Sequence, residues 1–466
     1  MPKSISMITF MAIILLASGL PVRADDGGLS STMLERIGAT VKMDNHTRTI
    51  YNALTNTDIN NLALDRDLLN AQSNLFSNKI KAKSITNQKS SGRCWLFAAL
   101  NVLRPAVIDK YKIENFEFSQ NYLSFWDKLE KANCFLEYII EFRNRDTLDR
   151  ELEQIMKDPI GDGGWWEYAV DLIEKYGVVP KEIMPETNSS ENTGAMNKII
   201  TRLLRSDALR IRELARDGKK IEALRAEKEK MLSDIYKILV VNLGQPPSEF
   251  PYRYQIKDSS LSDYVTYTPL SFYKNFVSVD LHEYVTIFND PTKAYRKHYR
   301  MSMGRNMYDR PEVDYVNVEI DLLKEAARKM IIDSQPVWFT CEVGADQNSS
   351  RGLMTSGLYD YNAIYNIDFG MTKAAALISH EITTSHAMVL VGVDIRDEKT
   401  VKWQVENSWG SDNKNGGYWT MYDNWFDENV FSVIVKKKYL PENVLDIFKE
   451  EPIIRPAWDI MAPLFR

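Results

Sequence analysis

The sequence predicts an α+β fold with two lobes, one mainly helical and one rich in β-strands. The run from Trp95 to Leu103, in which only Asn101 is polar, is typical of a buried helix. Two segments rich in β-branched residues, Val389 to Val393 and Val401 to Val405, are typical of strands. The chain has 466 residues, of which 44% are apolar, so it is long enough for two or three domains with large cores.

The first 24 residues have the pattern of a secretory signal peptide. Lys3 precedes an apolar stretch from Ile5 to Leu20, and a cleavage site follows after Ala24. The stretch is shorter than the roughly 20 apolar residues that a membrane span needs, and Ser18 and Gly19 interrupt it. We therefore expect an exported protein, secreted or periplasmic, without a stable membrane span. An uncleaved membrane anchor is the alternative.

Residues 25–190 are predicted to form an N-terminal segment and the helical lobe. The segment from Asp25 to about Asn78 is polar and favours only short helices, around Leu34 and from Leu62 to Leu75. Longer helices are then expected where apolar residues recur at helical spacing, in Trp95 to Leu103, Gln120 to Lys131, Phe135 to Met156 and Trp166 to Tyr176. Gly177 is expected to end the last of them.

Residues 191–300 are predicted to be a mainly helical insertion. Apolar residues recur at roughly helical spacing from Asn197 to Leu239 among many charged residues, and Asp217-Gly218 divides this pattern into two helices. A charge-rich helix pair more often forms a solvated face or a subunit contact than a catalytic site. The aromatic-rich stretch from Tyr252 to Tyr299 shows no regular pattern.

Residues 301–440 are predicted to form the β-rich lobe, and residues 441–466 a C-terminal arm. A helix is expected from Ile320 to Ile332 and a strand from Val337 to Val343. The two later strands place His386 just before one strand and Asn407 just after the other. The lobe therefore presents two polar side chains at strand ends.

Cys94 is the candidate nucleophile. A thiol has an ordinary pKa of about 8.5 and reacts as the thiolate, which a helix N-terminus and a protonated histidine both favour. His386 is expected to pair with Cys94 as an imidazolium, to lower the pKa of the thiol and to protonate a leaving amine. Asn407 would accept a hydrogen bond from the other ring nitrogen and orient it. His380 is the competing base, and His386 is preferred because the apolar strand from Ala387 to Val391 follows it.

Gln88 is the candidate oxyanion donor. Its side-chain amide, together with the backbone N–H of Cys94, would stabilise the negative charge of a tetrahedral intermediate. Cys134 and Cys341 are interpreted as small buried hydrophobes. Three cysteines in so long a chain do not make a disulfide framework, and whether these two pair is left open.

Gly163 and Gly164 are candidate substrate-binding residues. Glycine lets a backbone approach a ligand closely, so this segment is a candidate substrate cradle. The alternative is a plain turn before the helix that begins at Trp166.

The composition argues against several other functions. The net charge of -6 lacks the basic excess that a nucleic-acid-binding surface needs. The five His and three Cys are scattered singly, so no metal site is predicted. Thiol chemistry of the kind described requires no cofactor.

Together these residues resemble the papain superfamily of cysteine peptidases, in its bleomycin hydrolase and aminopeptidase C branch. The resemblance rests on Gln88 six residues before Cys94, on Ser385-His386-Ala387-Met388 and on Glu406-Asn407-Ser408-Trp409-Gly410, and it covers most of the chain after about residue 65. It implies a papain-like two-lobe fold with a helical lobe and a β-barrel-like lobe. The nucleophile and base are about 290 residues apart, against about 130 to 150 in papain-like enzymes, which indicates a large insertion.

In that branch the insertion helps to build a homohexamer with the active sites facing an inner chamber, and the C-terminal arm lies in the cleft. The terminal carboxylate, here on Arg466, would hold the free amine of a substrate. Pro463, Phe465 and Arg466 are bulkier than the residues usual at this end. The resemblance implies a cysteine aminopeptidase that acts on peptides with a free N-terminus. A papain-like endopeptidase and a catalytically quiet peptide-binding scaffold are the alternatives.

Overall fold

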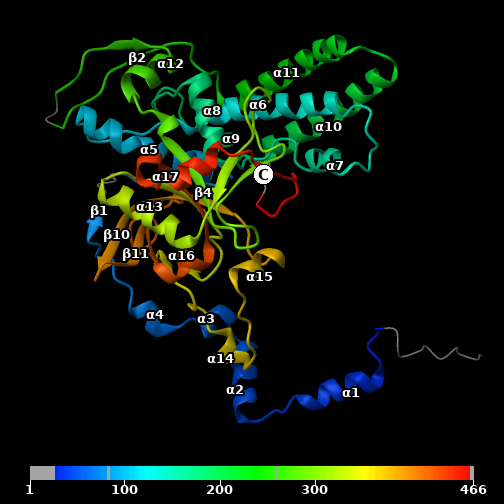
Figure 1. Cartoon of the computed structure of the whole chain (residues 1–466), viewed down its shortest axis with the longest axis vertical. Coiled ribbons are helices and arrows are strands. Elements are labelled where there is room, and N and C mark those ends of the chain that lie inside the picture. Colours follow the sequence, from blue (N-terminus) through cyan, green and yellow to red (C-terminus); the bar gives the residue numbers. More distant parts are fainter. Residues whose placement is uncertain (1–26, 81–83, 258–259, 462–466) are drawn as a thin grey trace, which may run out of the picture. The chain divides into compact units, whose positions relative to one another are not determined.

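The computed structural model describes residues 27–80, 84–257 and 260–461 of the chain (Figure 1). The predictions for the signal segment, residues 1–24, and for Arg466 lie outside these residues. The chain divides into two units, Met1–Leu62 and Ala63–Arg466. The sequence did not predict a boundary after Leu62.

The first unit contains two exposed helices, α1 (Ser31–Thr40) and α2 (Asn45–Leu54). Ser30 and Asp44 cap them by accepting hydrogen bonds from backbone N–H groups of the first turn. α1 confirms the helix expected around Leu34. α2 was not predicted, because neither helix has a buried face whose periodicity would mark it in the sequence.

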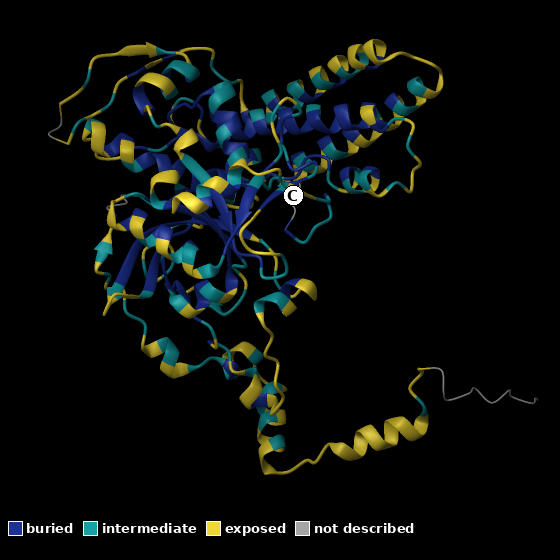
Figure 2. Ribbon diagram, viewed as in Figure 1, coloured by how far each residue is buried: buried dark blue, intermediate teal, exposed yellow. Residues whose placement is uncertain are grey.

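The helical lobe belongs to the second unit. It follows the short elements α3 (Ile59–Ala63), α4 (Arg66–Asn70) and β1 (Asn78–Lys79), and it consists of α5 (Cys94–Tyr111), α6 (Gln120–Glu141), α7 (Arg150–Lys157), α8 (Trp166–Tyr176) and α9 (Asn188–Glu191). α5 and α6 are buried along most of their length (Figure 2). These two helices therefore form the centre of the lobe.

The predicted interruption between Lys131 and Phe135 is wrong, because α6 continues through it. Ala132 and Cys134 are fully buried and belong to the same hydrophobic core as Phe135 and Leu136. The chain leaves the helix only after Glu141, and Asp149 then caps α7. Because polar and charged residues occupy buried faces of α6, the sequence lacks the apolar pattern that would indicate a single long helix.

Gly177 ends α8 where the sequence predicted. Its φ of 74° lies in the left-handed region, and a Cβ there would come within 2.2 Å of the Pro269 backbone. Only glycine fits this close approach between the end of α8 and the later part of the insertion at Pro269.

The insertion begins with the predicted helix pair, α10 (Gly194–Arg216) and α11 (Ile221–Leu243). The break between them falls at Asp217-Gly218, as expected, with Gly218 at a φ of 81°. Each helix buries one apolar stripe, which includes Ile200 and Leu204 in α10 and Ile235 and Leu239 in α11. α11 lies along α6, so the pair is fixed to the helical lobe.

The aromatic-rich stretch folds into short, irregular elements around a ring cluster. These are β2 (Phe250–Tyr252), β3 (Val265–Tyr267), α12 (Pro269–Ser271), the π-helix η1 (Phe272–Val277) and the 3-10 helix η2 (Leu281–Glu283). Phe272 and Phe276 stack with ring centroids 4.5 Å apart at the centre of the cluster. Aromatic packing rather than helical or strand periodicity organises this segment, which explains the absence of a regular pattern.

A twelve-stranded sheet dominates the second lobe. Its path is β14-β5-β6-β4-β13-β7-β10-β11-β12-β9-β8, and β1 also pairs with β10. The strands are β4 (Tyr284–Phe288), β5 (Lys297–Met301), β6 (Asp314–Asn317), β7 (Val337–Cys341), β8 (Gln347–Asn348), β9 (Leu353–Met354), β10 (His386–Arg396), β11 (Lys399–Glu406), β12 (Tyr418–Tyr422), β13 (Val430–Lys436) and β14 (Ile453–Arg455). β4 and β5 come from residues assigned to the insertion, so that segment also completes the sheet.

Helices and short turns of helix complete this lobe. They are α13 (Ile320–Ile332), α14 (Tyr361–Tyr365), α15 (Lys373–Ile378), α16 (Asp423–Asn429), η3 (Lys437–Tyr439), α17 (Glu442–Leu445) and η4 (Asp446–Lys449). α13 has the bounds that the sequence predicted. Among the described helices, none is both long and apolar enough to cross a membrane.

The strand β10 joins two hydrophobic cores. Ala387, Val389 and Val391 belong to the core shared with the helical lobe, whereas Met388 and Leu390 belong to the core under α13. This alternation is expected of a strand that is covered on both faces. The position of β10 between the two lobes is therefore rigidly set by packing.

Glu167 should make the protein less stable as the pH rises from about 4.5 to about 7. Its Oε1 accepts a hydrogen bond from the Thr286 hydroxyl, and among the described residues Oε2 has no partner. Burial raises the pKa of Glu167 to about 7. The folded protein keeps this proton up to about pH 7, whereas the unfolded chain releases it near its ordinary pKa of 4.5. Folding is therefore weakened by about 1.4 kcal/mol per pH unit across this window.

Urea unfolding at pH 5 and pH 8 measures this effect. Between these pH values, wild type should lose about 2 to 3 kcal/mol more of its unfolding free energy than Glu167→Gln, which cannot ionise. An equal loss in both proteins would contradict the buried, protonated carboxyl.

Candidate active site

His386 and Asn407 meet because β10 and β11 are antiparallel neighbours. His386 begins β10 and Asn407 directly follows β11. Because these strands are antiparallel neighbours, both residues lie at the same end of the strand pair. His386 Nε2 and Asn407 Oδ1 are 2.9 Å apart, and both side chains are buried. The Trp409 ring lies 4.8 Å from the imidazole, centroid to centroid, and shields this hydrogen bond. The other ring nitrogen, Nδ1, is left for proton exchange.

Cys94 is the first residue of α5 and faces the start of β10. Its sulfur receives a hydrogen bond from the backbone of Ala387, the residue that follows His386. The indole Nε1 of Trp338 in β7 donates to the Trp95 carbonyl over 3.1 Å, which fixes the start of α5 against the sheet. The structure thus brings together the thiol of one lobe and the imidazole of the other.

Burial controls the charge states of this pair. It raises the pKa of the Cys94 thiol to about 11, against the lowering effect of backbone hydrogen bonds from Ala387 and Trp95. It also lowers the pKa of His386 to about 4, although the hydrogen bond to Asn407 acts in the opposite direction. The expected lowering of the thiol pKa is therefore not met.

Desolvation disfavours a lone thiolate and a lone imidazolium alike. Transfer of one proton from sulfur to Nδ1 creates both charges together, so that their attraction offsets part of the desolvation of each. The arrangement suits a thiol that is deprotonated by His386 as it attacks, with the positive end of α5 beneath the developing charge.

Gln88 is attached to the segment that carries Asn407. Its backbone N–H donates to the Ser408 carbonyl over 2.8 Å, and its Oε1 accepts from the Ser408 hydroxyl over 2.6 Å. Its Nε2 donates to the Ser91 carbonyl over 2.6 Å, which uses one of the two amide hydrogens. The second hydrogen remains for an oxyanion. Ser408 also donates its N–H to Asn407 Oδ1, so it connects the predicted oxyanion donor to the residue that orients the base.

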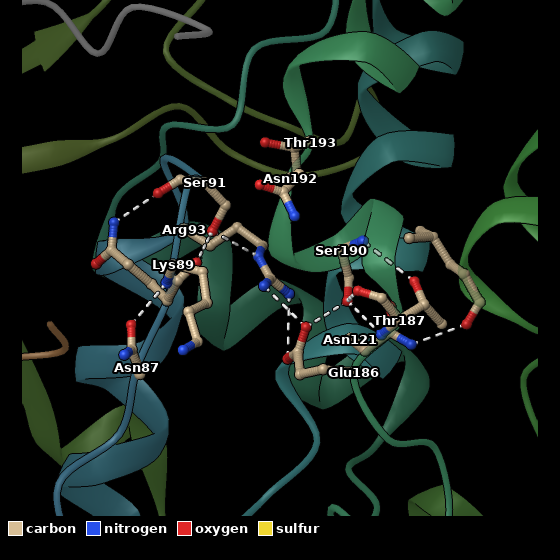
Figure 3. Close-up of polar contacts among 12 residues, drawn as sticks. Asn87, Lys89, Ser91, Arg93, Asn121, Glu186, Thr187, Ser190, Asn192 and Thr193 are labelled. Atoms are coloured by element: carbon tan, nitrogen blue, oxygen red, sulfur yellow. Dashed lines mark hydrogen bonds and ion pairs between the residues drawn. The ribbon is translucent and has the colours of Figure 1, made fainter. Parts of the chain in front are cut away.

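A buried arginine holds the loop before the nucleophile. Arg93 pairs with Glu186 over 2.9 Å and donates from Nε to the Ser91 hydroxyl over 3.1 Å (Figure 3). The Ser190 hydroxyl donates to the same carboxylate, and Ser190 also caps α9 together with Thr187. Figure 3 shows this network between the loop and the helix that precedes the insertion. The loop geometry around Cys94 thus depends on α9.

The other sequence-predicted site residues are placed differently. Gly164 lies against the Trp95 ring, next to the nucleophile, and the Gly163 carbonyl accepts from Lys131, whereas Arg466 lies outside the described residues. His380 is exposed at the end of α15, in a turn with a φ of 61°. Cys134 and Cys341 are buried free thiols. In the described part of the chain, no group of three or more His, Cys, Asp or Glu could hold a metal ion.

Sequence reasoning missed several supporting residues. Ser408 was recognised only within the segment from Glu406 to Gly410, and Arg93 was given no role. Asp162, the Lys128 that pairs with it, and the Lys131 that donates to the Gly163 carbonyl were given no role either. An Asp beside two glycines is a signal that could have found the first of these, but charged residues in a helix are ordinarily assigned to the surface.

The comparisons with known proteins agree with this geometry. A model of the Peptidase C1-like family matches residues 28–462. The chain belongs to the Peptidase C1-like family. The predicted resemblance is confirmed, and this protein is a cysteine peptidase with the two-lobe α+β fold.

The peptidase is similar to proteins from distant organisms along most of its length. It is 40% identical to aminopeptidase C of Listeria innocua over 392 residues, which cover 84% of this chain and 88% of that protein. It is 35% identical to bleomycin hydrolase of Rattus norvegicus over 452 residues, which cover 94% and 100% of the two chains. The crystal structure of PepW from Lactobacillus rhamnosis HN001 matches with a TM-score of 0.91 at 37% identity, over 93% of this chain and 99% of that chain.

Proposed function

We propose that this peptidase is an aminopeptidase that removes N-terminal residues from peptides through a thioester intermediate. The observation that carries the proposal is the hydrogen bond between His386 and Asn407 beside the Cys94 thiol. Gln88 is hydrogen-bonded to Ser408, the residue that follows Asn407. The similarity to proteins named aminopeptidase C supports the exopeptidase assignment. Peptides with a free N-terminus are the proposed substrates.

Each active-site residue has its own role in the reaction. The Cys94 sulfur attacks the scissile carbonyl carbon while its proton passes to His386 Nδ1. Gln88 Nε2 and the Cys94 N–H donate to the oxyanion. His386 then gives the proton to the departing amine, the C–N bond breaks, and a thioester remains. Water, deprotonated by His386, attacks the thioester and releases the N-terminal residue as its carboxylic acid while the thiol recovers its proton.

The anchoring of the C-terminal arm supports restriction to free N-termini. Asp459 accepts from Lys293 Nζ over 2.9 Å and from Arg455 Nε over 2.8 Å, and its side chain is only 3% exposed. Met461 is fully buried, and the Trp458 ring lies under the Arg150 guanidinium at 4.2 Å. The chain is thus fixed up to Met461.

The first experiment compares fluorogenic peptides that differ only in a free or an acetylated N-terminus, under reducing conditions. Release from the free form alone supports the aminopeptidase. Equal release from both forms would make the protein an endopeptidase, and release from neither would favour the peptide-binding scaffold.

Deletion of residues 462–466 should open the enzyme to blocked peptides. The anchor at Asp459 and Met461 remains in this variant, so the arm is shortened without being detached. We expect cleavage of acetylated peptides to rise at least about tenfold, because the terminal carboxylate is moved five residues back to Met461 and no longer selects the free amine. Unchanged products would contradict the role of the tail. A variant with Arg466→Ala alone keeps a terminal carboxylate at the same position and serves as the control.

We further propose that the mature enzyme is exported and forms a homo-oligomer, specifically a hexamer. The signal pattern of residues 1–24 supports export, and the family resemblance noted from the sequence supports assembly. Mass determination of the secreted protein tests both. An intact N-terminus would contradict cleavage after Ala24, and a monomer in solution would contradict the hexamer.

A further inference from the structure

A buried lysine holds the carbonyl of Gly163. Lys131 lies in α6 with its side chain fully buried, and its Nζ donates to the Gly163 carbonyl over 2.5 Å and to the Gly161 carbonyl over 3.0 Å. Asp127, one turn earlier, balances its charge at 2.9 Å. Burial lowers the pKa of Lys131, and the carboxylate of Asp127 opposes this shift. Two of the three ammonium hydrogens are thus committed to the backbone of the glycine segment.

A second buried lysine ties the same segment to the nucleophile loop. Lys128 Nζ donates to Asp162 Oδ1 over 2.6 Å and to the carbonyls of Ile160 and Gly161. Asp162 Oδ2 in turn accepts from the N–H of Gly92, two residues before the nucleophile, over 2.9 Å. The indole Nε1 of Trp95 donates to the Asp162 carbonyl over 2.7 Å. The glycine segment and the start of α5 therefore move as one piece.

Burying two ammonium groups is costly, because each loses its hydration. Apolar side chains could fill this volume at a lower cost in free energy. What the lysines provide instead is a set of directed hydrogen bonds that fix the orientation of individual peptide groups. The presence of buried lysines therefore indicates that the function requires a precise backbone geometry in the glycine segment.

The orientation of one peptide group has a direct consequence for binding. In a planar trans peptide the C=O and the following N–H point in opposite directions. Since the Gly163 carbonyl points inward to Lys131, the N–H of Gly164 points away from the protein interior. Neither the N–H nor the C=O of Gly164 has a hydrogen-bond partner among the described residues. A Cβ at Gly164 would lie 2.5 Å from the Trp95 ring, so the backbone itself lies against the residue next to the nucleophile.

We propose that Lys131 is a positioning residue for substrate binding, which turns the Gly164 N–H toward the cleft so that it pairs with the backbone of an extended peptide. Lys128 and Asp162 hold this donor at a fixed distance from Cys94. The inference rests on the proposed peptidase function and adds the element that sets its peptide-binding edge. Lys131 does not touch the reacting atoms, and its effect is exerted through the Gly163-Gly164 peptide group.

The test is the double variant Asp127→Asn/Lys131→Met, which removes both charges and keeps the acceptor for Asn306 at position 127. With free N-terminus peptides we expect KM to rise about tenfold, the value of one backbone hydrogen bond, and kcat to change less than threefold. The rate at which iodoacetamide alkylates Cys94 should stay within twofold of wild type, because the small reagent needs no peptide-binding edge. Glu137→Gln/Lys228→Met removes an ion pair between α6 and α11 without touching the glycine segment, and its KM should stay at the wild-type value.

An unchanged KM in the Lys131 double variant would overturn the proposal, as would a parallel fall of kcat and of the alkylation rate. If the variant fails to fold, hydrogen exchange of the wild-type enzyme decides the question. A peptide aldehyde with a free N-terminus should slow exchange in the segment that contains Gly164, and absence of this protection would overturn the proposal. If the wild-type enzyme itself cleaves no peptide, the proposed function is refuted instead.

Discussion

Replacement of Cys94 by Ala will lower kcat/KM by at least about 10⁴-fold and leave the protein folded. The sulfur is the only group at the start of α5 that can form the thioester, and His386 and Gln88 act only on the species that it creates. The nucleophile and its base act together. Removal of the nucleophile therefore removes nearly all of the rate enhancement that the catalytic residues provide. Initial rates with a free N-terminus peptide, together with thermal unfolding, measure both parts of the expectation.

Cys134→Ala is the matched control for this result. Cys134 is also a free thiol, fully buried in α6, and burial raises its pKa far above the ordinary value. The control should lose some stability, because a buried side chain becomes smaller, and keep its activity. More than about a tenth of wild-type activity in Cys94→Ala would show that another residue supplies the nucleophile.

The local sequence was sufficient to predict an element where a single clear pattern marks it. The helices at Trp166–Tyr176 and Ile320–Ile332 have the predicted bounds, because an apolar stripe marks each of them, with Gly177 after the first. The active-site residues could be predicted because thiol chemistry restricts which residue types stand together. His386 could be preferred to His380 because only the former starts an apolar strand that lies between two cores.

Tertiary structure decided the rest. α6 carries Asp127, Lys128 and Lys131 on buried faces, where they hold the loop of Gly163 rather than meeting solvent. No local pattern distinguishes such lysines from surface ones, and the interruption predicted in α6 was wrong for the same reason. The raised pKa of Cys94 was also hidden from the sequence, because it arises from burial between two lobes whose contact involves residues far apart in the chain.

Arg104→Met will destabilise the protein by about 3 to 5 kcal/mol, because it leaves a carboxylate buried without its partner. Arg104 lies on α5 in the helical lobe, is 1% exposed, and contacts Glu406 Oε1 over 2.7 Å. Burial raises the pKa of Glu406, and the charge of Arg104 opposes this shift. Without Arg104, folding will require Glu406 to bind a proton. The unfolded chain releases that proton above its ordinary pKa, so the loss of stability will be larger at pH 8 than at pH 5.

This ion pair also affects catalysis, because Glu406 directly precedes Asn407. Arg104→Met should lower kcat as the end of β11 shifts, whereas Arg104→Met/Glu406→Gln, which removes both charges, should recover at least half of the lost stability. Lys329→Met breaks the exposed pair with Glu325 and should change the unfolding free energy by less than about 0.5 kcal/mol. Urea unfolding of the four proteins at both pH values measures these differences. A loss below about 1 kcal/mol in Arg104→Met would mean that water reaches Glu406 and that this ion pair contributes little to holding the two lobes together.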